Sequence, residues 1–363
     1  MEKSNRDHQG RPDAQNSGQP MELHFTPNNG AADEAIEALI KMVGGIGRPG
    51  IVRELILASL KAGQEDDHKA DLKLMNTTLK EMRFTAKIFG PYRSIRKVSV
   101  FGSARTPREA DSYRMAQELG RRLASRNYMV ITGGGPGIMQ AVNEGAGPEH
   151  SFGINIRLPF EQKPNPIVDG NPRSINYKYF FNRKVAFLKE ADAVVLFPGG
   201  FGTLDEAMET LTLAQTGKHN PLPVVMIEPP GRDYWKTWLG FLRDQLAGGA
   251  YIDREDLALF AITDSVDQAV EMIEQFYRRY HSLRFVGDLL VIRMRSALPA
   301  AAYDRLRDDF TDLLSPGGQF TATTALPQES DEPALADLPR LAIDFNRTQF
   351  ARLKALIDFI NAQ

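Results

Sequence analysis

The segment at residues 193–209, AVVLFPGGFGTLDEAME, combines a glycine-rich turn with side chains that could do chemistry. Its apolar run ends at a Pro-Gly-Gly turn, and a helical pattern begins at Thr203. Such a turn leaves backbone N–H groups open at the positive end of the helix dipole, where phosphate groups commonly bind. We expect Thr203 to cap the helix and Glu206 to place a carboxylate near the same anion-binding end of the helix. A strand-to-helix turn without a ligand is the alternative interpretation.

Two other apolar runs also end in small residues. Residues 98–104 contain Gly102 and Ser103, and residues 128–139 contain the sequence TGGGPG. The glycines of that second turn are Gly133, Gly134 and Gly135. If the three runs are parallel strands, their turns converge at one edge of the sheet, where ligands of such folds bind.

The aromatic segment at residues 177–189 turns into a helix that carries Arg183 and Lys184. Because this helix precedes the strand at 193–197, its N-terminal half should lie near the ligand edge. Arg183 would then face Glu206 across a pocket. A surface ion pair for Arg183, with the aromatic residues in the core, is an equally open interpretation.

The elements that must position these residues alternate between strands and helices. We expect strands at 98–104, 128–132, 152–158, 193–197 and 223–227, and helices at 111–127, 177–191, from 203 onward, at 234–247 and at 265–280. This alternation predicts an α/β fold: a Rossmann-like, doubly wound parallel sheet with helices on both faces.

Four regions are expected along the chain. Residues 1–30 are polar and predicted to be a disordered tail, and residues 31–96 form an N-terminal helical extension of about three helices. Residues 97–282 form the nucleotide-binding domain. Residues 283–363 form a small C-terminal β-α-β-α appendix, with a polar loop at 315–339. The appendix could sense a ligand or form a dimer, although a structural extension of the core is the simpler interpretation.

Composition excludes several classes of protein. The chain has no cysteine, which rules out disulfides and thiolate metal sites and fits the cytoplasm. A net charge of -2 gives no reason to expect nucleic acid or an anionic membrane as a partner. No apolar run approaches the roughly 18 residues of a membrane span. The six histidines show no metal-ligand spacing, so we expect no metal.

Two common nucleotide motifs are missing. The glycine turn after residue 132 lacks the third glycine of a dinucleotide fingerprint and the acidic ribose ligand about 20 residues on. No glycine-rich turn ends in Gly-Lys-Ser or Gly-Lys-Thr, so kinase or ATPase chemistry of the P-loop type is not expected.

The motifs GSA at 102–104, TGGGPGIM at 132–139, RK at 183–184 and PGGFGTLDE at 198–206 stand together in this chain. As a set they resemble the LOG family, the cytokinin riboside 5'-monophosphate phosphoribohydrolases once mislabelled as lysine decarboxylases. The resemblance covers about half of the chain, from residue 97 to residue 281. A decarboxylase would need a Schiff-base lysine for pyridoxal phosphate, and no lysine here has a supporting motif.

The resemblance implies hydrolysis of the N-glycosidic bond of a nucleoside 5'-monophosphate to free base and ribose 5-phosphate. It implies Arg183 and Glu206 as catalytic residues, no cofactor, and a homodimer with pockets near the subunit interface. The substrate could be AMP, a cytokinin nucleotide or another nucleotide. A nucleotide-binding sensor on the same scaffold is the alternative function.

The resemblance also implies a set of substrate-binding residues. They are Gly102, Ser103, Gly133, Gly134, Gly135, Lys184, Gly199, Gly200, Gly202, Thr203 and Glu209. Among them Gly200, Gly202 and Thr203 would hold the 5'-phosphate. We expect Glu209, which shares a helix face with Glu206, to be the second carboxylate of the pocket and Asp205 to point elsewhere.

Overall fold

The structure is a computed structural model that describes residues 21–65, 68–158 and 163–363. The chain divides into two compact units, of which the first ends at Leu79 and the second begins at Lys80. None of the described helices combines the length and apolar content that crossing a membrane would require.

The first unit contains α1 (Ala31–Val43), α2 (Pro49–Glu65) and the start of α3 (Lys69–Phe89). Leu23 is buried against Ile36 of α1 and Leu57 of α2. Ordered structure therefore starts before the predicted boundary at residue 30, because Leu23 anchors the approach to α1. Residues 1–20 of the predicted tail lie outside the described part of the chain.

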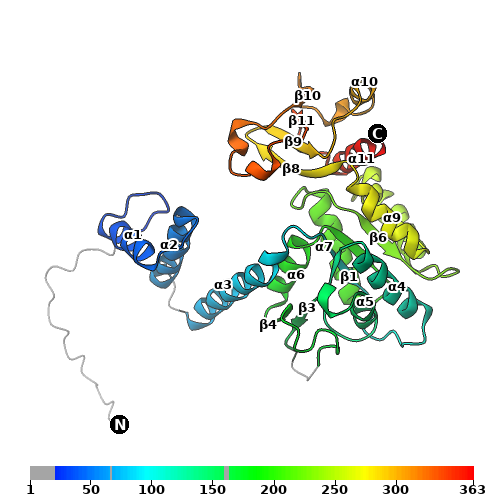
Figure 1. The fold of residues 1–363 in the computed structure, drawn as a ribbon, viewed down its shortest axis with the longest axis horizontal. Coiled ribbons are helices and arrows are strands. Elements are labelled where there is room, and N and C mark those ends of the chain that lie inside the picture. The colour runs from blue at the N-terminus through cyan, green and yellow to red at the C-terminus, as the bar shows by residue number, and fades with distance from the viewer. Residues whose placement is uncertain (1–20, 66–67, 159–162) are drawn as a thin grey trace, which may run out of the picture. The chain divides into compact units, whose positions relative to one another are not determined.

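The second unit is built on a seven-stranded parallel sheet, coloured from cyan to yellow-green in Figure 1. Its strands are β1 (Lys97–Phe101), β2 (Met129–Thr132), β3 (Ser151–Ile156), β4 (Ser174–Tyr177), β5 (Ala193–Leu196), β6 (Val224–Ile227) and β7 (Ala261–Thr263). Their order is β4-β3-β2-β1-β5-β6-β7. The chain therefore winds outward from β1 in one direction and then in the other, as predicted for a doubly wound α/β fold.

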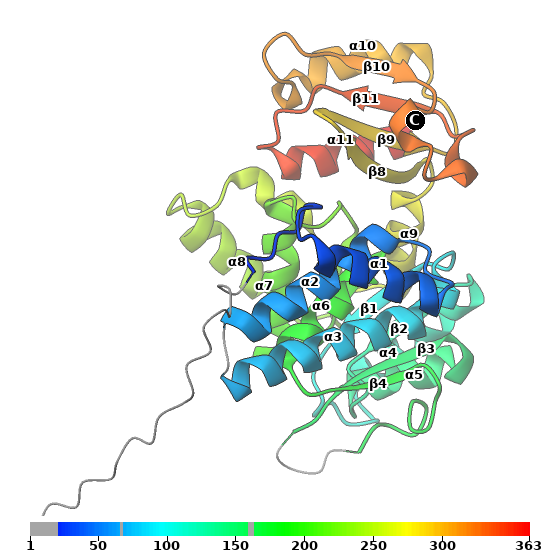
Figure 2. The ribbon, with the colours of Figure 1, turned by 90° about the vertical axis from the view of Figure 1, so that its left-hand side faces the viewer.

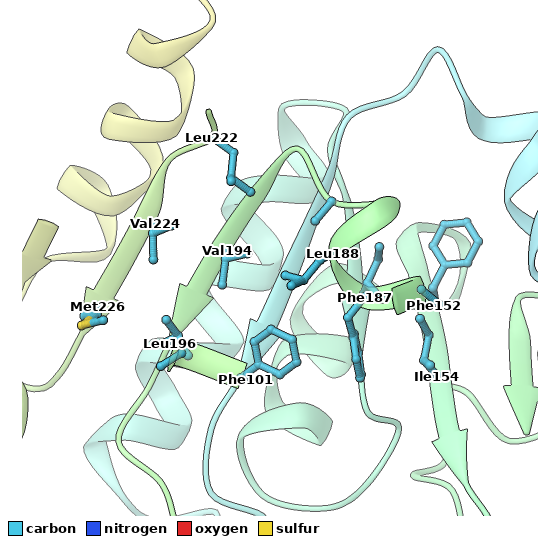
Figure 3. Packing of buried hydrophobic residues seen from close by; sticks show 14 of the residues in the cluster. Phe101, Phe152, Ile154, Phe187, Leu188, Val194, Leu196, Leu222, Val224 and Met226 are labelled. Atoms are coloured by element: carbon cyan, nitrogen blue, oxygen red, sulfur yellow. The ribbon is translucent and has the colours of Figure 1, made fainter. Parts of the chain in front are cut away.

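Helices cover both faces of this sheet. One face packs on α4 (Asp111–Ser125), α5 (Ile138–Ala146) and α9 (Val266–Phe276). The other face packs on the end of α3 and on α6 (Phe180–Lys189), α7 (Phe201–Gln215) and α8 (Tyr234–Phe241). α8 continues as a π-helix (Leu242–Ala247). Figure 3 shows Val194 and Leu196 of β5 projecting to the same side as Phe187 of α6. Strands buried on both faces explain the nearly continuous apolar runs in the sequence.

The second unit also takes in the last part of α3. Phe89 at the end of that helix stacks on Phe152 of β3, with ring centroids 4.2 Å apart. The division after Leu79 therefore differs from the predicted boundary between residues 96 and 97, because the end of α3 belongs to the core of the sheet domain.

The C-terminal part forms a second, antiparallel sheet (Figure 2). Its elements are β8 (Tyr280–Val286), β9 (Leu289–Met294), α10 (Ala300–Asp309), β10 (Phe320–Thr323), β11 (Arg340–Ile343) and α11 (Phe350–Ala362), with strand order β10-β11-β9-β8. Short 3-10 turns at Gly90–Tyr92, Pro148–His150, Arg254–Leu259, Thr311–Leu313, Pro327–Glu329 and Pro333–Leu335 complete the fold. Both helices pack on one face of this sheet through a single apolar cluster.

Four strands were missing from the prediction, namely β4, β7, β8 and β10. The helix predicted at 265–280 ends at Phe276, and β8 begins at Tyr280, before the predicted appendix boundary at 283. β10 lies inside the predicted loop at 315–339. β4, β7 and β10 are short, and only pairing with a neighbour distinguishes them from loop. β8 is longer, but it alternates polar and apolar residues and begins where the helix was predicted to end.

The other face of the second sheet buries an ion cluster. Arg293 of β9 and Arg340 of β11 are paired across the two strands, and Glu329 lies between their side chains. Its carboxylate accepts from Arg293 Nε at 2.8 Å and from Arg340 Nε at 3.0 Å. Burial alone would raise the pKa of Glu329, but the Leu326 N–H and the two guanidinium groups outweigh it and hold the pKa at about 2.

Replacing Glu329 by Gln is expected to lower the free energy of unfolding by about 3 kcal/mol, because buried Arg340 loses its carboxylate partner and buried Arg293 keeps only Glu332. Asp331→Asn, which weakens the exposed pair with Arg284, is the matched control and should cost less than about 1 kcal/mol. Urea unfolding at neutral pH measures both variants. Equal losses would show that the buried cluster contributes no more than a surface pair.

Candidate functional site

A large cavity lies at the carboxyl ends of β1 and β5, where the direction of winding reverses. Its volume is about 840 Å³, and we call it the switch-point pocket. Nine predicted site residues line it: Gly102, Ser103, Gly133, Arg183, Gly199, Gly200, Gly202, Thr203 and Glu206. Three separate turns in the sequence therefore meet in one place, as expected for the switch point of an open α/β sheet.

The helix at this pocket begins earlier than predicted. α7 starts at Phe201 with Gly200 as its N-cap residue, and no side chain caps it. Thr203 is the third residue of the helix, and its N–H donates to the Gly200 carbonyl at 3.0 Å. The prediction that Thr203 caps the helix is therefore wrong, because the Pro-Gly-Gly turn closes two residues sooner. The N–H groups at Phe201 and Gly202 have no intrahelical acceptor and lie at the positive end of the dipole.

The glycines of the pocket serve two different purposes. A Cβ on Gly102 would lie 2.7 Å from Ile138, and one on Gly199 would lie 2.1 Å from the Thr203 hydroxyl, so packing requires both glycines. A Cβ on Gly200 or Gly202 would meet nothing within 4 Å. These two positions leave the backbone of the first turn of α7 open to a ligand.

Arg183 lies on α6 and reaches across to the glycine turn after β2. Its Nε donates to the Ile154 carbonyl at 2.8 Å, and its Nη2 donates to the Gly133 carbonyl at 3.4 Å. The guanidinium also lies over the Phe187 ring, 5.1 Å from its centroid. Burial lowers the pKa of Arg183, and the nearby charge of Glu206 opposes that effect. The side chain is thus a positioned cation in the wall of the pocket.

Glu206 is buried, with 9% of its surface exposed. Its Oε2 has no hydrogen-bond partner among the described residues. Burial raises the pKa of Glu206 to about 7, and the charges of Glu209 and Asp205 add to this while Lys184 and Arg183 oppose it. A buried carboxyl that titrates near neutrality, with a free oxygen in the same pocket as a fixed guanidinium, can stabilise a developing positive charge or transfer a proton.

Lys184 and Glu209 do not line the switch-point pocket, contrary to their predicted role. Lys184 Nζ lies 2.7 Å from Asp205 Oδ2 and 2.9 Å from Glu209 Oε2, and both Lys184 and Glu209 line a different cavity. Asp205, which was expected to point elsewhere, lines the switch-point pocket. The prediction for the two carboxylates is thus reversed. Lys184 pairs with both, so the difference lies in position along α7: Asp205 is one turn nearer than Glu209 to the start of the helix, where the pocket lies.

The remaining predicted glycines, Gly134 and Gly135, line a smaller adjoining cavity of about 230 Å³, together with Gly133 and Arg183. Asn165 holds this turn in place: its N–H donates to the Gly134 carbonyl at 2.7 Å and its side-chain amide to the Gly135 carbonyl at 3.1 Å. Sequence analysis missed Asn165, because no motif marks it and its partners lie about 30 residues earlier.

Tyr234 was also missed. Its hydroxyl donates to the Gly199 carbonyl at 2.7 Å and so fixes the turn that starts α7. Met139 and Phe180 complete the apolar part of the pocket lining. The motif TGGGPGIM contained Met139, but only the folded chain shows that its side chain faces the site.

Comparison with known proteins places this geometry in a family. A family model described as a possible lysine decarboxylase matches residues 138–273. The cytokinin riboside 5'-monophosphate phosphoribohydrolase LOG of Oryza sativa subsp. japonica is 27% identical over 190 residues, which cover 51% of this chain and 75% of that protein. The probable cytokinin riboside 5'-monophosphate phosphoribohydrolase LOGL9 of the same organism is 31% identical over 188 residues, which cover 50% of this chain and 78% of that protein. The chain belongs to the LOG family.

The segment matched by the family model contains both Arg183 and Glu206. The first unit and the second sheet lie outside it, as do β1 and β2. We call the first unit and the second sheet the two additional parts of the chain. Among solved structures, the X-ray structure of TM1055 is 29% identical and covers 50% of this chain and 99% of its own, with a TM-score of 0.36. The assignment of the fold rests on the strand order given above.

Proposed function

We propose that this LOG protein hydrolyses the N-glycosidic bond of nucleoside 5'-monophosphates, releasing the free base and ribose 5-phosphate. The observation that carries the proposal is the buried Glu206 carboxyl, with one unpartnered oxygen, in the same pocket as Arg183. The names of the relatives, phosphoribohydrolases of cytokinin riboside 5'-monophosphate, agree with it.

In the proposed reaction the 5'-phosphate binds at the start of α7, against the open backbone of Gly200 and Gly202 and the hydroxyl of Thr203. The bond from the anomeric carbon to the base breaks, and the base leaves with the electron pair. Ionised Glu206 stabilises the resulting oxocarbenium-like ribose and orients a water, whose oxygen bonds to that carbon. The guanidinium of Arg183 stabilises the negative charge that develops on the departing base, which finally takes up the proton released by the water.

The reaction should require the ionised form of Glu206, which gives a definite pH dependence. Because burial raises the pKa of Glu206 to about 7, kcat/KM is expected to rise about tenfold per pH unit below that value and to level off above it. Initial rates from pH 5 to pH 9 measure the profile. A rate that falls above pH 7 would instead assign Glu206 the role of a general acid.

Release of free base and ribose 5-phosphate from a panel of nucleoside monophosphates tests the proposal. The panel includes AMP and an N6-prenylated AMP, because these distinguish a general nucleosidase from a cytokinin-activating enzyme. Release that disappears in Glu206→Gln supports the hydrolase and ranks the bases. Nucleotide binding without release from any member contradicts it and favours a sensor, for which the two additional parts of the chain would be output surfaces.

We also propose that the chain forms a homodimer near this pocket. Phe180 and Phe201, which line the switch-point pocket, are 56% and 92% exposed. Exposed aromatic rings of this size commonly become buried in an interface. Sedimentation at micromolar concentration should give twice the mass of the chain, and a monomer would contradict the proposal.

A further inference from the structure

A second cavity, of about 570 Å³, lies at the opposite edge of the seven-stranded sheet from the switch-point pocket. Arg96, Asp192 and Leu222 line it and come just before β1, β5 and β6. We call it the amino-edge cavity. The segment around Tyr277, which leads from α9 into the second sheet, forms one wall and follows the part of the chain matched by the family model. Its volume is in the range of about 300–1,000 Å³ that is typical of small-molecule sites.

The amino-edge cavity combines apolar and cationic surface. Leu188, Leu213 and Leu222 supply apolar lining. Four cationic residues line it, and three of them already have carboxylate partners: Arg96 pairs with Asp192, Lys184 with Asp205 and Glu209, and Lys189 with Glu190. The fourth is Lys218. The guanidinium of Arg96 lies 3.4 Å from the centroid of the Tyr277 ring. Lys218 is exposed and forms no ion pair with any described residue.

Two helices end at this cavity, and free carbonyl groups there would favour a cation. Both ends already have donors, however. The Leu188 carbonyl of α6 faces His219 Nε2 at 3.0 Å, and the Tyr277 carbonyl after α9 accepts from Arg295 Nε at 3.2 Å. Lys218, which has no ion pair with any described residue, is therefore the lining group that favours an anion.

The titration of His281, which also lines the cavity, agrees with a positive local field. Burial lowers the pKa of His281, and the charges of Arg295 and Arg96 lower it further.

We propose that the amino-edge cavity binds a small organic anion with a planar apolar body, and that its occupation acts on Glu206 through Lys184. The anionic group would pair with Lys218 and Lys184 at the rim, and the apolar body would lie on the leucine side chains beneath. The second half of this proposal rests on the proposed function, whereas binding itself does not.

Lys184 is the link between the two cavities. It lines the amino-edge cavity, and its ammonium is 2.7 Å from Asp205, which lines the switch-point pocket next to Glu206. The charged groups that act on Glu206 are Arg183 and Lys184 of α6 and Asp205 and Glu209 of α7. Of these, Lys184 does most to lower the pKa of Glu206. An anion paired with Lys184 would offset that charge, so fewer Glu206 side chains would be ionised at neutral pH.

Fluorescence titration of the full chain with 8-anilinonaphthalene-1-sulfonate, an anion on an apolar aromatic body, tests binding. Lys218→Glu is expected to weaken binding at least about fivefold, because it reverses a charge at the rim. Lys236→Glu, an exposed lysine on α8 outside the cavity, is the matched control and should bind like the unaltered chain. Equal binding by Lys218→Glu and the control would overturn the proposed site.

The effect of binding on Glu206 is measured by ¹³C NMR titration of the glutamate carboxyls. The Glu206 signal is identified by its absence in Glu206→Gln. A saturating concentration of the probe should raise the pH at which half of the Glu206 carboxyls are ionised by about half a pH unit, and Lys218→Glu should abolish that shift. Binding without a shift overturns the link. Because this readout needs no turnover, it stays valid if no nucleotide is hydrolysed. If hydrolysis does occur, the pH profile of kcat should move by the same amount.

Discussion

Replacing Glu206 by Gln is expected to lower kcat for release of a base from its nucleoside 5'-monophosphate at least about a thousandfold. The amide keeps the size of the side chain but carries no charge to stabilise the ribose cation and is a poor partner for the attacking water. Binding of the phosphate at the start of α7 is separate from this position, so KM should change little. Single-turnover release of base from AMP measures the effect. A loss below about tenfold would remove Glu206 from the reaction.

The same substitution should stabilise the fold at alkaline pH. The pKa of Glu206 is raised by burial to about 7 from an ordinary value of 4.5, so the folded chain favours the neutral form. The stabilisation of the fold linked to that proton is fully present below about pH 4.5 and is lost as the pH rises through 7. Because Gln is never charged, Glu206→Gln should raise the free energy of unfolding by about 3 kcal/mol at pH 8 and by little at pH 4.5.

Urea unfolding of the variant at both pH values measures this difference. Glu271→Gln on the exposed surface of α9 is the matched control and should show no comparable change with pH. An inactive variant that is also more stable at pH 8 is difficult to explain by misfolding. An inactive variant with a lower free energy of unfolding at pH 8 would contradict the conclusion that burial of the Glu206 carboxylate destabilises the fold at that pH.

Replacing Arg183 by Ala is expected to lower kcat/KM about a thousandfold, the second large effect. The guanidinium is fixed by the carbonyls of Ile154 and Gly133 and faces the pocket, so its contribution to the departing base needs no reorganisation. Steady-state rates with the preferred nucleotide measure the loss. Arg183→Lys should recover little of it, because a single ammonium cannot reach both carbonyls and the base together.

Added guanidinium ion gives a control for this variant. It should restore part of the activity of Arg183→Ala if only the side chain is missing, and none if the pocket has collapsed. Arg232→Ala, an exposed residue before α8, should behave like the unaltered chain. A fully active Arg183→Ala would leave the departing base without the proposed partner.

Much of the domain built on the seven-stranded sheet could be predicted from the sequence, because its signals are local. Parallel strands buried on both faces are continuous apolar runs, and glycine turns mark where they end, so β1, β2 and β5 and their convergence were confirmed. The short strands β4 and β10 could not be found, since neither is apolar enough to be distinguished from a loop before it pairs.

The sequence by itself determined which residue types stand at the switch point, including Arg183 and Glu206, because these lie in contiguous motifs. Only the tertiary structure decided their surroundings: that Asp205 and not Glu209 lines the pocket, and that Asn165 and Tyr234 hold the glycine turns. It also decided that Lys184 pairs with α7. The physical reason is that charge pairing and burial depend on groups distant in the chain, which come together only when α6 and α7 pack on the same face of the sheet.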